Sequence, residues 1–320
     1  MFAVIVFDFL DTIADHLQIE GFELRALLSV LLISAVCGMV GAMVVGNRMA
    51  FFSDAMAHCA FAGVALGILM TYFMAVGRER EELQRWFVPL VMVGFGAAIG
   101  IGIAFVREST GLASDTVIGV FFAGAIGFGA MLLTALKGRR AIDPEQFLFG
   151  SPIYVKDIDL LYLIVLLLLT VGLLMWRFNH LLLGSFNTSL ARSRRVSLRV
   201  NSYLFIILLA FIVNLSISAV GVLLINAMLI VPAATATNFS RNLRQMFWWT
   251  LALSISAGIG GLFLSSRIYI RLGGESLQFG PSGTIITLSV LGFFGSMAGM
   301  SLARRWRESK RNVAPYVPRS

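Results

Sequence analysis

The strongest constraint on this chain is a series of long apolar stretches separated by short segments that carry most of its charged residues. A helix needs about 20 mostly apolar residues to cross the hydrocarbon core of a bilayer. The sequence therefore predicts an all-α, polytopic membrane bundle with about nine spans, and eight or ten as alternatives. The spans cover approximately residues 25–46, 50–76, 87–106, 116–136, 158–176, 203–219, 220–237, 247–266 and 284–302.

The sixth and seventh spans form one continuous apolar stretch that is too long for a single crossing, so we divide it around Ser216 to Gly221. The chain as a whole divides into three parts. Residues 1–24 form an amphipathic N-terminal segment, residues 25–302 the transmembrane domain, and residues 303–320 a basic tail.

Composition supports a membrane protein and argues against other classes. Of the 320 residues, 58% are hydrophobic and 13% are charged, whereas soluble domains carry about 25% charged residues. The net charge of +8 does not indicate nucleic-acid binding, because the basic residues lie between apolar runs and not in a stripe beside aromatic side chains. The two cysteines, Cys37 and Cys59, both lie in apolar segments and provide neither a disulfide framework nor a paired-cysteine zinc site.

The distribution of lysine and arginine predicts the orientation of the chain in the membrane. With nine spans the two termini lie on opposite sides. Most basic residues fall on one side, which includes Arg107, the segment 192–199 and the C-terminal group 304–319. Because cytoplasmic loops carry an excess of lysine and arginine, we expect the C-terminus to be cytoplasmic, where its charges can also meet membrane lipid.

Asp54 and His58 are the most informative polar residues. An ionisable side chain at bilayer depth costs at least about 2.5 to 3.5 kcal/mol. Their spacing of four places both on one face of a helix, where a carboxylate and an imidazole can bind a divalent cation. The alternative is structural: Asp54 caps a helix break and accepts a hydrogen bond from His58. We favour the metal pathway.

Three further residues are weaker candidates for lining the pathway. Cys59 neighbours His58 but is rotated away from it by one position. Asn226 interrupts a deep apolar run, which interhelical hydrogen bonding explains as well as a pathway does. Asp115 begins a span, where favourable interaction with the helix dipole is the better explanation.

The motifs of several enzyme classes are missing. The sequence has no Gly-x-x-x-x-Gly-Lys-Ser/Thr loop for ATP and no His-Glu-x-x-His zinc motif. Gly280-Pro281-Ser282-Gly283 matches the pattern of an intramembrane serine protease, but none of the histidines follows Ser282 to act as a base. We therefore predict a transport subunit and not an enzyme.

The segment 47–67, NRMAFFSDAMAHCAFAGVALG, resembles the Arg-Arg-Met-Ser-x-x-Gly-Asp-Ala-x-x-His-x-x-x-Pro-Gly-Val-Ala segment of the zinc/manganese/iron ABC permeases. Further similar segments follow in the same order along the chain. They are residues 115–120, 147–151, 220–224, 228–236 and 281–284. The chain is thus similar to that family from about residue 25 to 302, and the resemblance implies the fold of the metal and vitamin ABC importer permeases.

The resemblance also implies partners and a substrate. It implies a homodimer in the bacterial cytoplasmic membrane, two cytoplasmic ABC ATPase subunits and an extracytoplasmic metal-binding protein. The transported ion would be zinc, manganese or iron, with Asp54 and His58 as ligands and no intrinsic cofactor.

The family's segment for coupling to the ATPase corresponds to residues 186–195, which include Phe186, Asn187, Leu190, Ala191, Arg192 and Arg195. The family pattern Phe-Asp-Pro-Glu-x-Ala-x-x-x-Gly is altered here at Asn187, Ser189 and Arg195. An anchor at anionic lipid is the alternative role for this basic segment. For the whole chain, the alternative function is a secondary metal-ion carrier that needs no ATPase.

Overall fold

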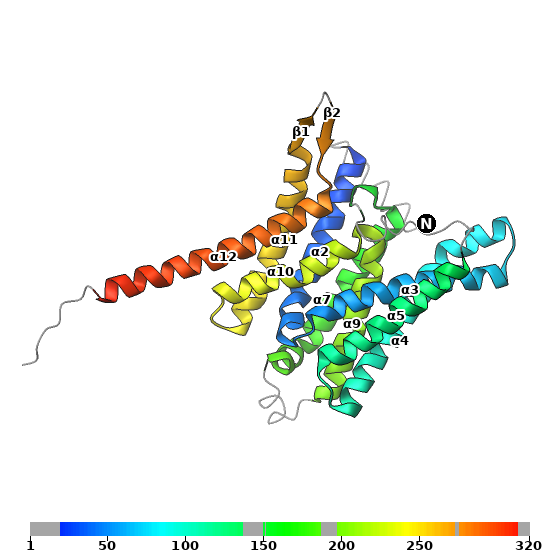
Figure 1. The fold of residues 1–320 in the computed structure, drawn as a ribbon, viewed down its shortest axis with the longest axis horizontal. Coiled ribbons are helices and arrows are strands. Elements are labelled where there is room, and N and C mark those ends of the chain that lie inside the picture. Colours follow the sequence, from blue (N-terminus) through cyan, green and yellow to red (C-terminus); the bar gives the residue numbers. More distant parts are fainter. Residues whose placement is uncertain (1–19, 137–149, 151, 187–196, 273–274, 313–320) are drawn as a thin grey trace, which may run out of the picture.

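The computed structural model describes residues 20–136, 150, 152–186, 197–272 and 275–312. In these residues long helices pack side by side, and one short strand pair projects from one end (Figure 1). The long helices are α2 (Gly21–Gly46), α3 (Ala50–Met74), α4 (Arg78–Thr110), α5 (Ser114–Ala135), α7 (Asp157–Phe186), α9 (Leu198–Val220), α10 (Val222–Phe239), α11 (Leu243–Arg267) and α12 (Pro281–Asn312). The short elements are η1 (Pro152–Tyr154), β1 (Tyr269–Leu272) and β2 (Glu275–Gln278).

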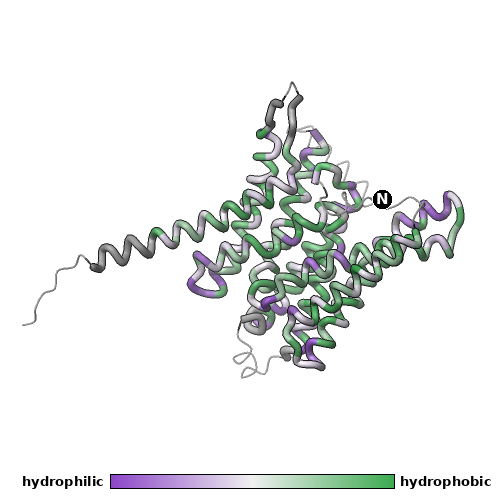
Figure 2. Tube along the Cα trace, in the orientation of Figure 1, coloured by the Kyte–Doolittle hydropathy of each residue, from purple (hydrophilic) through white to green (hydrophobic). Residues whose placement is uncertain are grey.

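Nine helices in the described part of the chain are long and apolar enough to cross a membrane, and each overlaps one predicted span. Apolar residues dominate along the helices, whereas hydrophilic residues gather mostly at their ends and connecting turns (Figure 2). The prediction of an all-α membrane bundle with about nine spans is therefore confirmed.

Helix α2 is the most deeply buried span. Of the residues in its most apolar stretch, 72% are buried, whereas 17% are buried in the corresponding stretch of α12. It packs against α7, α10 and α11, and glycines allow this close approach. A Cβ added at Gly38 would lie 2.9 Å from Leu251 Cα, and one at Gly41 would lie 2.6 Å from the Leu229 carbonyl oxygen. In lipid such small residues permit the dense helix packing that hydrophobicity alone does not drive.

Helix α3 lies in a second group with α4 and α5, and it also contacts α9 and α10. Glycines again mark the tightest points. A Cβ at Gly63 of α3 would lie 2.9 Å from Met92 Cα of α4, and one at Gly129 of α5 would lie 3.3 Å from Ala62 Cα. Its neighbours thus enclose α3 on several sides, and this helix carries Asp54 and His58.

The predicted division of the sixth and seventh spans is confirmed. Helix α9 ends at Val220 and α10 begins at Val222, with Gly221 at φ 82° and ψ 164° between them. Gly150, at φ 48°, packs against this break, because a Cβ added there would lie 2.6 Å from Gly221 Cα. The break is therefore fixed by two glycines with backbone angles that other residues rarely adopt.

The strand pair is an element that the sequence analysis did not predict. Strands β1 and β2 pair antiparallel between α11 and α12, with Tyr269 opposite Gln278 and Leu272 opposite Glu275. The sequence between the strands reads Gly273-Gly274, which is a recognised hairpin signal. A search for long apolar runs does not detect so short an element.

Some helices extend beyond the apolar runs that predicted them. Helix α4 begins at Arg78, well before the predicted start at 87. Helix α12 continues to Asn312, across the proposed boundary between the transmembrane domain and the basic tail at 302/303. Of the proposed N-terminal segment 1–24, residues 1–19 lie outside the described residues, and α2 begins at Gly21.

We predict that Gly41→Ala destabilises the bundle, because its new Cβ would meet the Leu229 carbonyl oxygen. Overpacking of this kind costs about 1–3 kcal/mol. The matched control is Gly94→Ala on α4, where a Cβ meets nothing within 4 Å. The apparent melting temperature in detergent should fall for Gly41→Ala and stay close to that of the wild type for Gly94→Ala. Equal melting temperatures for the two variants would contradict this account of the packing.

Candidate functional site

The site begins at a sharp turn that reverses the chain from α2 into α3. Arg48 adopts φ 55°, which is unusual for a residue other than glycine. The Asn47 side-chain amide donates to the Met43 carbonyl oxygen at 2.9 Å, and Met49 is buried with 1% of its surface exposed. Helix α3 then starts at Ala50, so that Asp54 follows one turn later.

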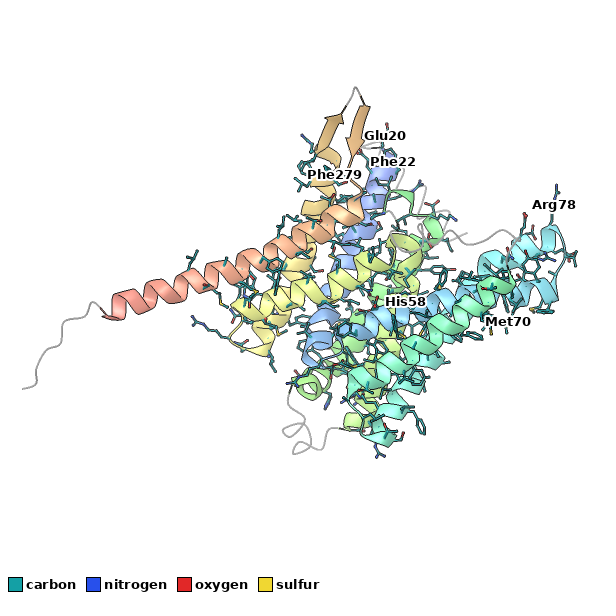
Figure 3. All side chains as sticks on the ribbon, in the orientation of Figure 1. Glu20, Phe22, His58, Met70, Arg78 and Phe279 are labelled. Atoms are coloured by element: carbon teal, nitrogen blue, oxygen red, sulfur yellow. The ribbon has the colours of Figure 1, made fainter. Side chains whose placement is uncertain are left out.

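Asp54 and His58 share one face of α3, as their spacing predicted. Both are partly exposed, whereas the residues between them, Ala55, Met56 and Ala57, are buried. His58 lies near the middle of the bundle in Figure 3. Its ring makes an edge-to-face contact with Phe122 of α5, with a centroid separation of 4.9 Å. The pair therefore lies on a partly exposed strip of α3, next to buried residues of the same helical turn.

Asn226 of α10 joins this pair. Its Nδ2 donates a hydrogen bond to Asp54 Oδ1 at 3.0 Å, across 172 residues of sequence. The interhelical hydrogen bond that the sequence analysis considered for Asn226 is therefore present, and its acceptor is the candidate metal ligand. The amide satisfies one oxygen of a carboxylate that would otherwise lack a partner at bilayer depth.

The structure does not bring the other two weak candidates to this strip. Cys59 is fully buried among apolar side chains of the core. Asp115 is exposed in the first turn of α5, after Ala113 at the N-cap position. Among the described residues, no three His, Cys, Asp or Glu side chains gather closely enough to hold a metal ion.

The donor atoms near Asp54 suit a divalent cation but do not complete a coordination sphere. The donor groups are the Asp54 carboxylate, the amide of Asn226 bonded to it, and the His58 imidazole one turn along α3. Zinc takes about four ligands, and larger divalent cations such as calcium take six or more. Three donor groups from one chain therefore fall short of a complete coordination sphere.

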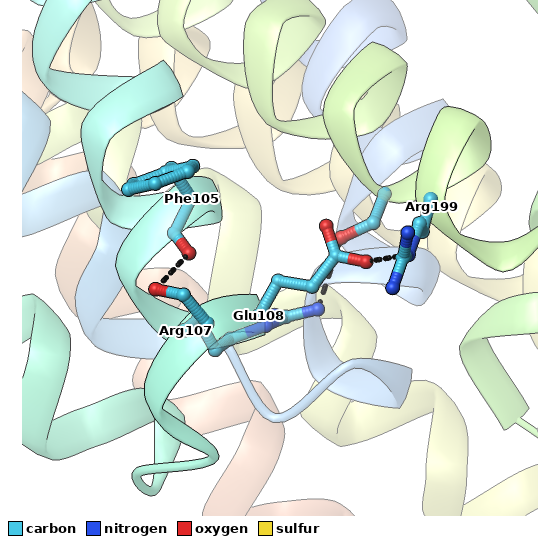
Figure 4. Close-up of polar contacts among 6 residues, drawn as sticks. Phe105, Arg107, Glu108 and Arg199 are labelled. Carbon is cyan, nitrogen blue, oxygen red and sulfur yellow. Dashed lines mark hydrogen bonds and ion pairs between the residues drawn. The ribbon is translucent and has the colours of Figure 1, made fainter.

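A second polar cluster lies where α4 and α9 meet, near the start of α3 (Figure 4). Arg107 of α4 donates through Nη2 to Ser202 Oγ at 3.0 Å and through Nη1 to Met49 Sδ at 3.4 Å. The neighbouring Glu108 forms an ion pair with Arg199 of α9. We call the end of the bundle that holds Arg107, Glu108 and Arg199 the arginine-rich end.

The sequence analysis treated Arg107 only as a determinant of topology and missed its structural contacts. Its position at the end of an apolar span was visible in the sequence, but its partners come from the turn before α3 and from α9. Phe186 ends α7 at the same end of the bundle. Asn187, Leu190, Ala191, Arg192 and Arg195 of the predicted coupling segment lie outside the described residues.

We predict that Arg107→Ala destabilises the protein more than Arg199→Ala. Arg107 is half-buried and bonded to Ser202 of α9 and to Met49 in the turn before α3, and leaving such partners unpaired costs about 1–3 kcal/mol. The Arg199 side chain is 81% exposed, and exposed ion pairs contribute about 0–1 kcal/mol. Melting in detergent compares the two variants, and a larger loss for Arg199→Ala would contradict the assigned roles.

Comparison with known proteins gives consistent matches over most of the chain. The ABC 3 transport family matches residues 20–299. The manganese transport system membrane protein MntC of Halalkalibacterium halodurans is 27% identical, covering 92% of this chain and 94% of that protein. The high-affinity zinc uptake system membrane protein ZnuB of Haemophilus influenzae is 29% identical, covering 75% and 87%. The solved structure of PsaBC from Streptococcus pneumoniae in complex with Fab superposes with a TM-score of 0.67 at 25% identity, covering 88% of this chain and 93% of that chain.

Proposed function

The chain belongs to the ABC 3 transport family, and we propose that it conducts a divalent metal ion, zinc, manganese or iron, past Asp54 and His58. As a family member it is the membrane permease component of an ABC transporter, and ATP hydrolysis belongs to a separate subunit. The relatives named above are manganese and zinc uptake proteins, which supports a metal as the substrate here. Family membership also favours ATP-driven import over the secondary carrier considered from the sequence.

The Asp54–Asn226 hydrogen bond beside His58 is the observation that carries this proposal. A carboxylate and an imidazole at bilayer depth are costly and need a reason to be present. A salt bridge does not supply that reason, because no ion pair involves Asp54 within the described part of the chain. Passage of a cation explains both residues at once, because it uses their charge and their ligand atoms.

A homodimer would complete the site. Each chain offers Asp54 and His58 on an accessible strip, and two such strips facing each other would bring four strong ligands to one ion. This number satisfies zinc and approaches the six or so ligands that harder cations take. The open coordination in one chain supports this arrangement, in which both copies contribute equally.

We further propose that the arginine-rich end faces the cytoplasm, where basic residues accumulate in membrane proteins. The ATPase subunits would dock there on the segment from Phe186 to Arg195, with Phe186, Leu190 and Ala191 as its apolar contacts and the arginines meeting an acidic rim. The opposite end, which carries the strand pair, would face the extracytoplasmic metal-binding protein. Membrane lipid surrounds the remaining apolar surface, in the bacterial cytoplasmic membrane.

Substitution at the site tests the metal pathway. Asp54→Asn and His58→Ala should each abolish most metal accumulation in cells that depend on this transporter, because each removes a primary ligand. The matched control is Ser53→Ala, since the buried Ser53 hydroxyl donates only to the Ala50 carbonyl oxygen of its own helix. Membrane abundance is measured for all three. Wild-type accumulation by both site variants at normal abundance would refute the ligand assignment.

Labelling from outside tests the orientation. In a chain with Cys37 and Cys59 replaced, Ser309→Cys should resist an impermeant thiol reagent in intact spheroplasts and react after permeabilisation. The expected protection follows from the excess of basic residues at this end of the chain. Reaction in intact spheroplasts would place the C-terminus outside and reverse both proposed docking faces.

A further inference from the structure

The side-chain amide of Asn226 uses only one of its two ends. Its Nδ2 donates to Asp54 Oδ1, whereas its Oδ1 is buried and has no hydrogen-bond partner. Asp54 determines this orientation, because a carboxylate accepts hydrogen bonds and would repel the amide oxygen. The unpaired amide oxygen therefore lies beside the candidate ligand and cannot be exchanged with the nitrogen without losing the bond to Asp54.

Asn214 provides an instructive contrast. Its Oδ1 is also buried without a partner, and its Nδ2 donates to the Ala210 carbonyl oxygen of the same helix. However, the whole Asn214 residue is buried and packs directly over Gly96. Asn226 is partly exposed, as are Ala227, Ile230 and Val231 along the same side of α10. Asn226 therefore differs from Asn214 in two respects: its amide bonds to an ionisable side chain, and the residue lies on a partly exposed side of its helix.

We propose that Asn226 is a specificity-determining residue whose Oδ1 acts as a third ligand to the passing ion. The inference rests on the proposed function, since it assigns a further ligand to the same site. Asp54 Oδ1 is held by the Asn226 N–H, which leaves Asp54 Oδ2 free for the ion. The ion would then meet a carboxylate oxygen, an amide oxygen and an imidazole nitrogen.

This donor set discriminates between the metals that the family carries. Carboxylate, carbonyl and water oxygens suit manganese and other hard cations that accept higher coordination numbers. Zinc prefers four ligands, with nitrogen or sulfur prominent among them. The amide oxygen therefore favours manganese over zinc, and His58 alone supplies the borderline nitrogen. The fully buried Cys59 does not add a sulfur ligand to offset this preference.

The hydrogen bond between Asn226 and Asp54 also fixes the position of the carboxylate. The N–H of Asn226 holds Asp54 Oδ1 in place whether or not an ion is bound. When an ion arrives, the amide does not need to rotate. Its nitrogen keeps the carboxylate in place while its oxygen faces the ion, so the two residues form a preorganised oxygen-rich pair.

Competition between manganese and zinc tests this role in the complete transporter, expressed with its ATPase and binding protein. Asn226→Leu keeps the approximate shape and removes both ends of the amide. The manganese-to-zinc accumulation ratio should fall about tenfold, equivalent to about 1.4 kcal/mol. Asn226→His should lower the ratio as well while retaining zinc accumulation, because an imidazole can bond to Asp54 and offer zinc a nitrogen. The binding protein's own preference cancels, because it is the same in every strain.

Asn238→Leu is the matched control. Asn238 lies on the same helix and donates to Ser296 Oγ of α12 at 2.7 Å, twelve residues from Asn226, so its ratio should stay at the wild-type value. Asn226→Ser is included in case a larger side chain prevents insertion, and ratios are read from variants at wild-type membrane abundance. An unchanged ratio, or equal loss of both metals, would overturn the specificity role. Absence of accumulation of manganese, zinc and iron by the wild type would instead reject the proposed function.

Discussion

The hydrogen bond between Asn226 and Asp54 links the two helices that carry the candidate site. A carboxylate at bilayer depth must find its partners within the protein, because the surrounding hydrocarbon offers none. Here the partner comes from α10, which packs closely against α2 and also contacts α3. The position of the site therefore depends on how closely these helices approach one another.

Small residues make that approach possible. Gly41 brings the α10 backbone against α2, and Gly63 brings α4 against α3. Both contacts are tight enough that a single added carbon would meet backbone atoms. Because apolar side chains gain little by leaving lipid for the protein interior, this dense packing replaces the hydrophobic effect as the force that orders the bundle. The polar site is then placed between helices that are already fixed.

The start of α3 is fixed separately, at the arginine-rich end. Arg107 of α4 contacts both Met49, just before α3, and Ser202 of α9. Glu108 and Arg199 add a second link between α4 and α9. Helix α9 follows the segment proposed to contact the ATPase, so a displacement of α9 would reach Met49, at the start of α3, through the half-buried Arg107 guanidinium. Asp54 lies one helical turn farther along α3, so a short series of contacts connects the candidate site to the proposed docking face.

The sequence by itself predicted the membrane class, about nine spans, the break near Gly221 and the shared face of Asp54 and His58. Each of these depends on local properties: the length of an apolar run, a glycine within it, or a spacing of four residues on a helix. Tertiary structure decided which residues from different helices contact one another, because local patterns carry no such information. Only the packing of the helices brought Asn226 to Asp54 across 172 residues, left Cys59 buried and gave Arg107 its partners. Contacts between helices depend on their relative rotation and depth, and neither can be inferred from a single apolar run.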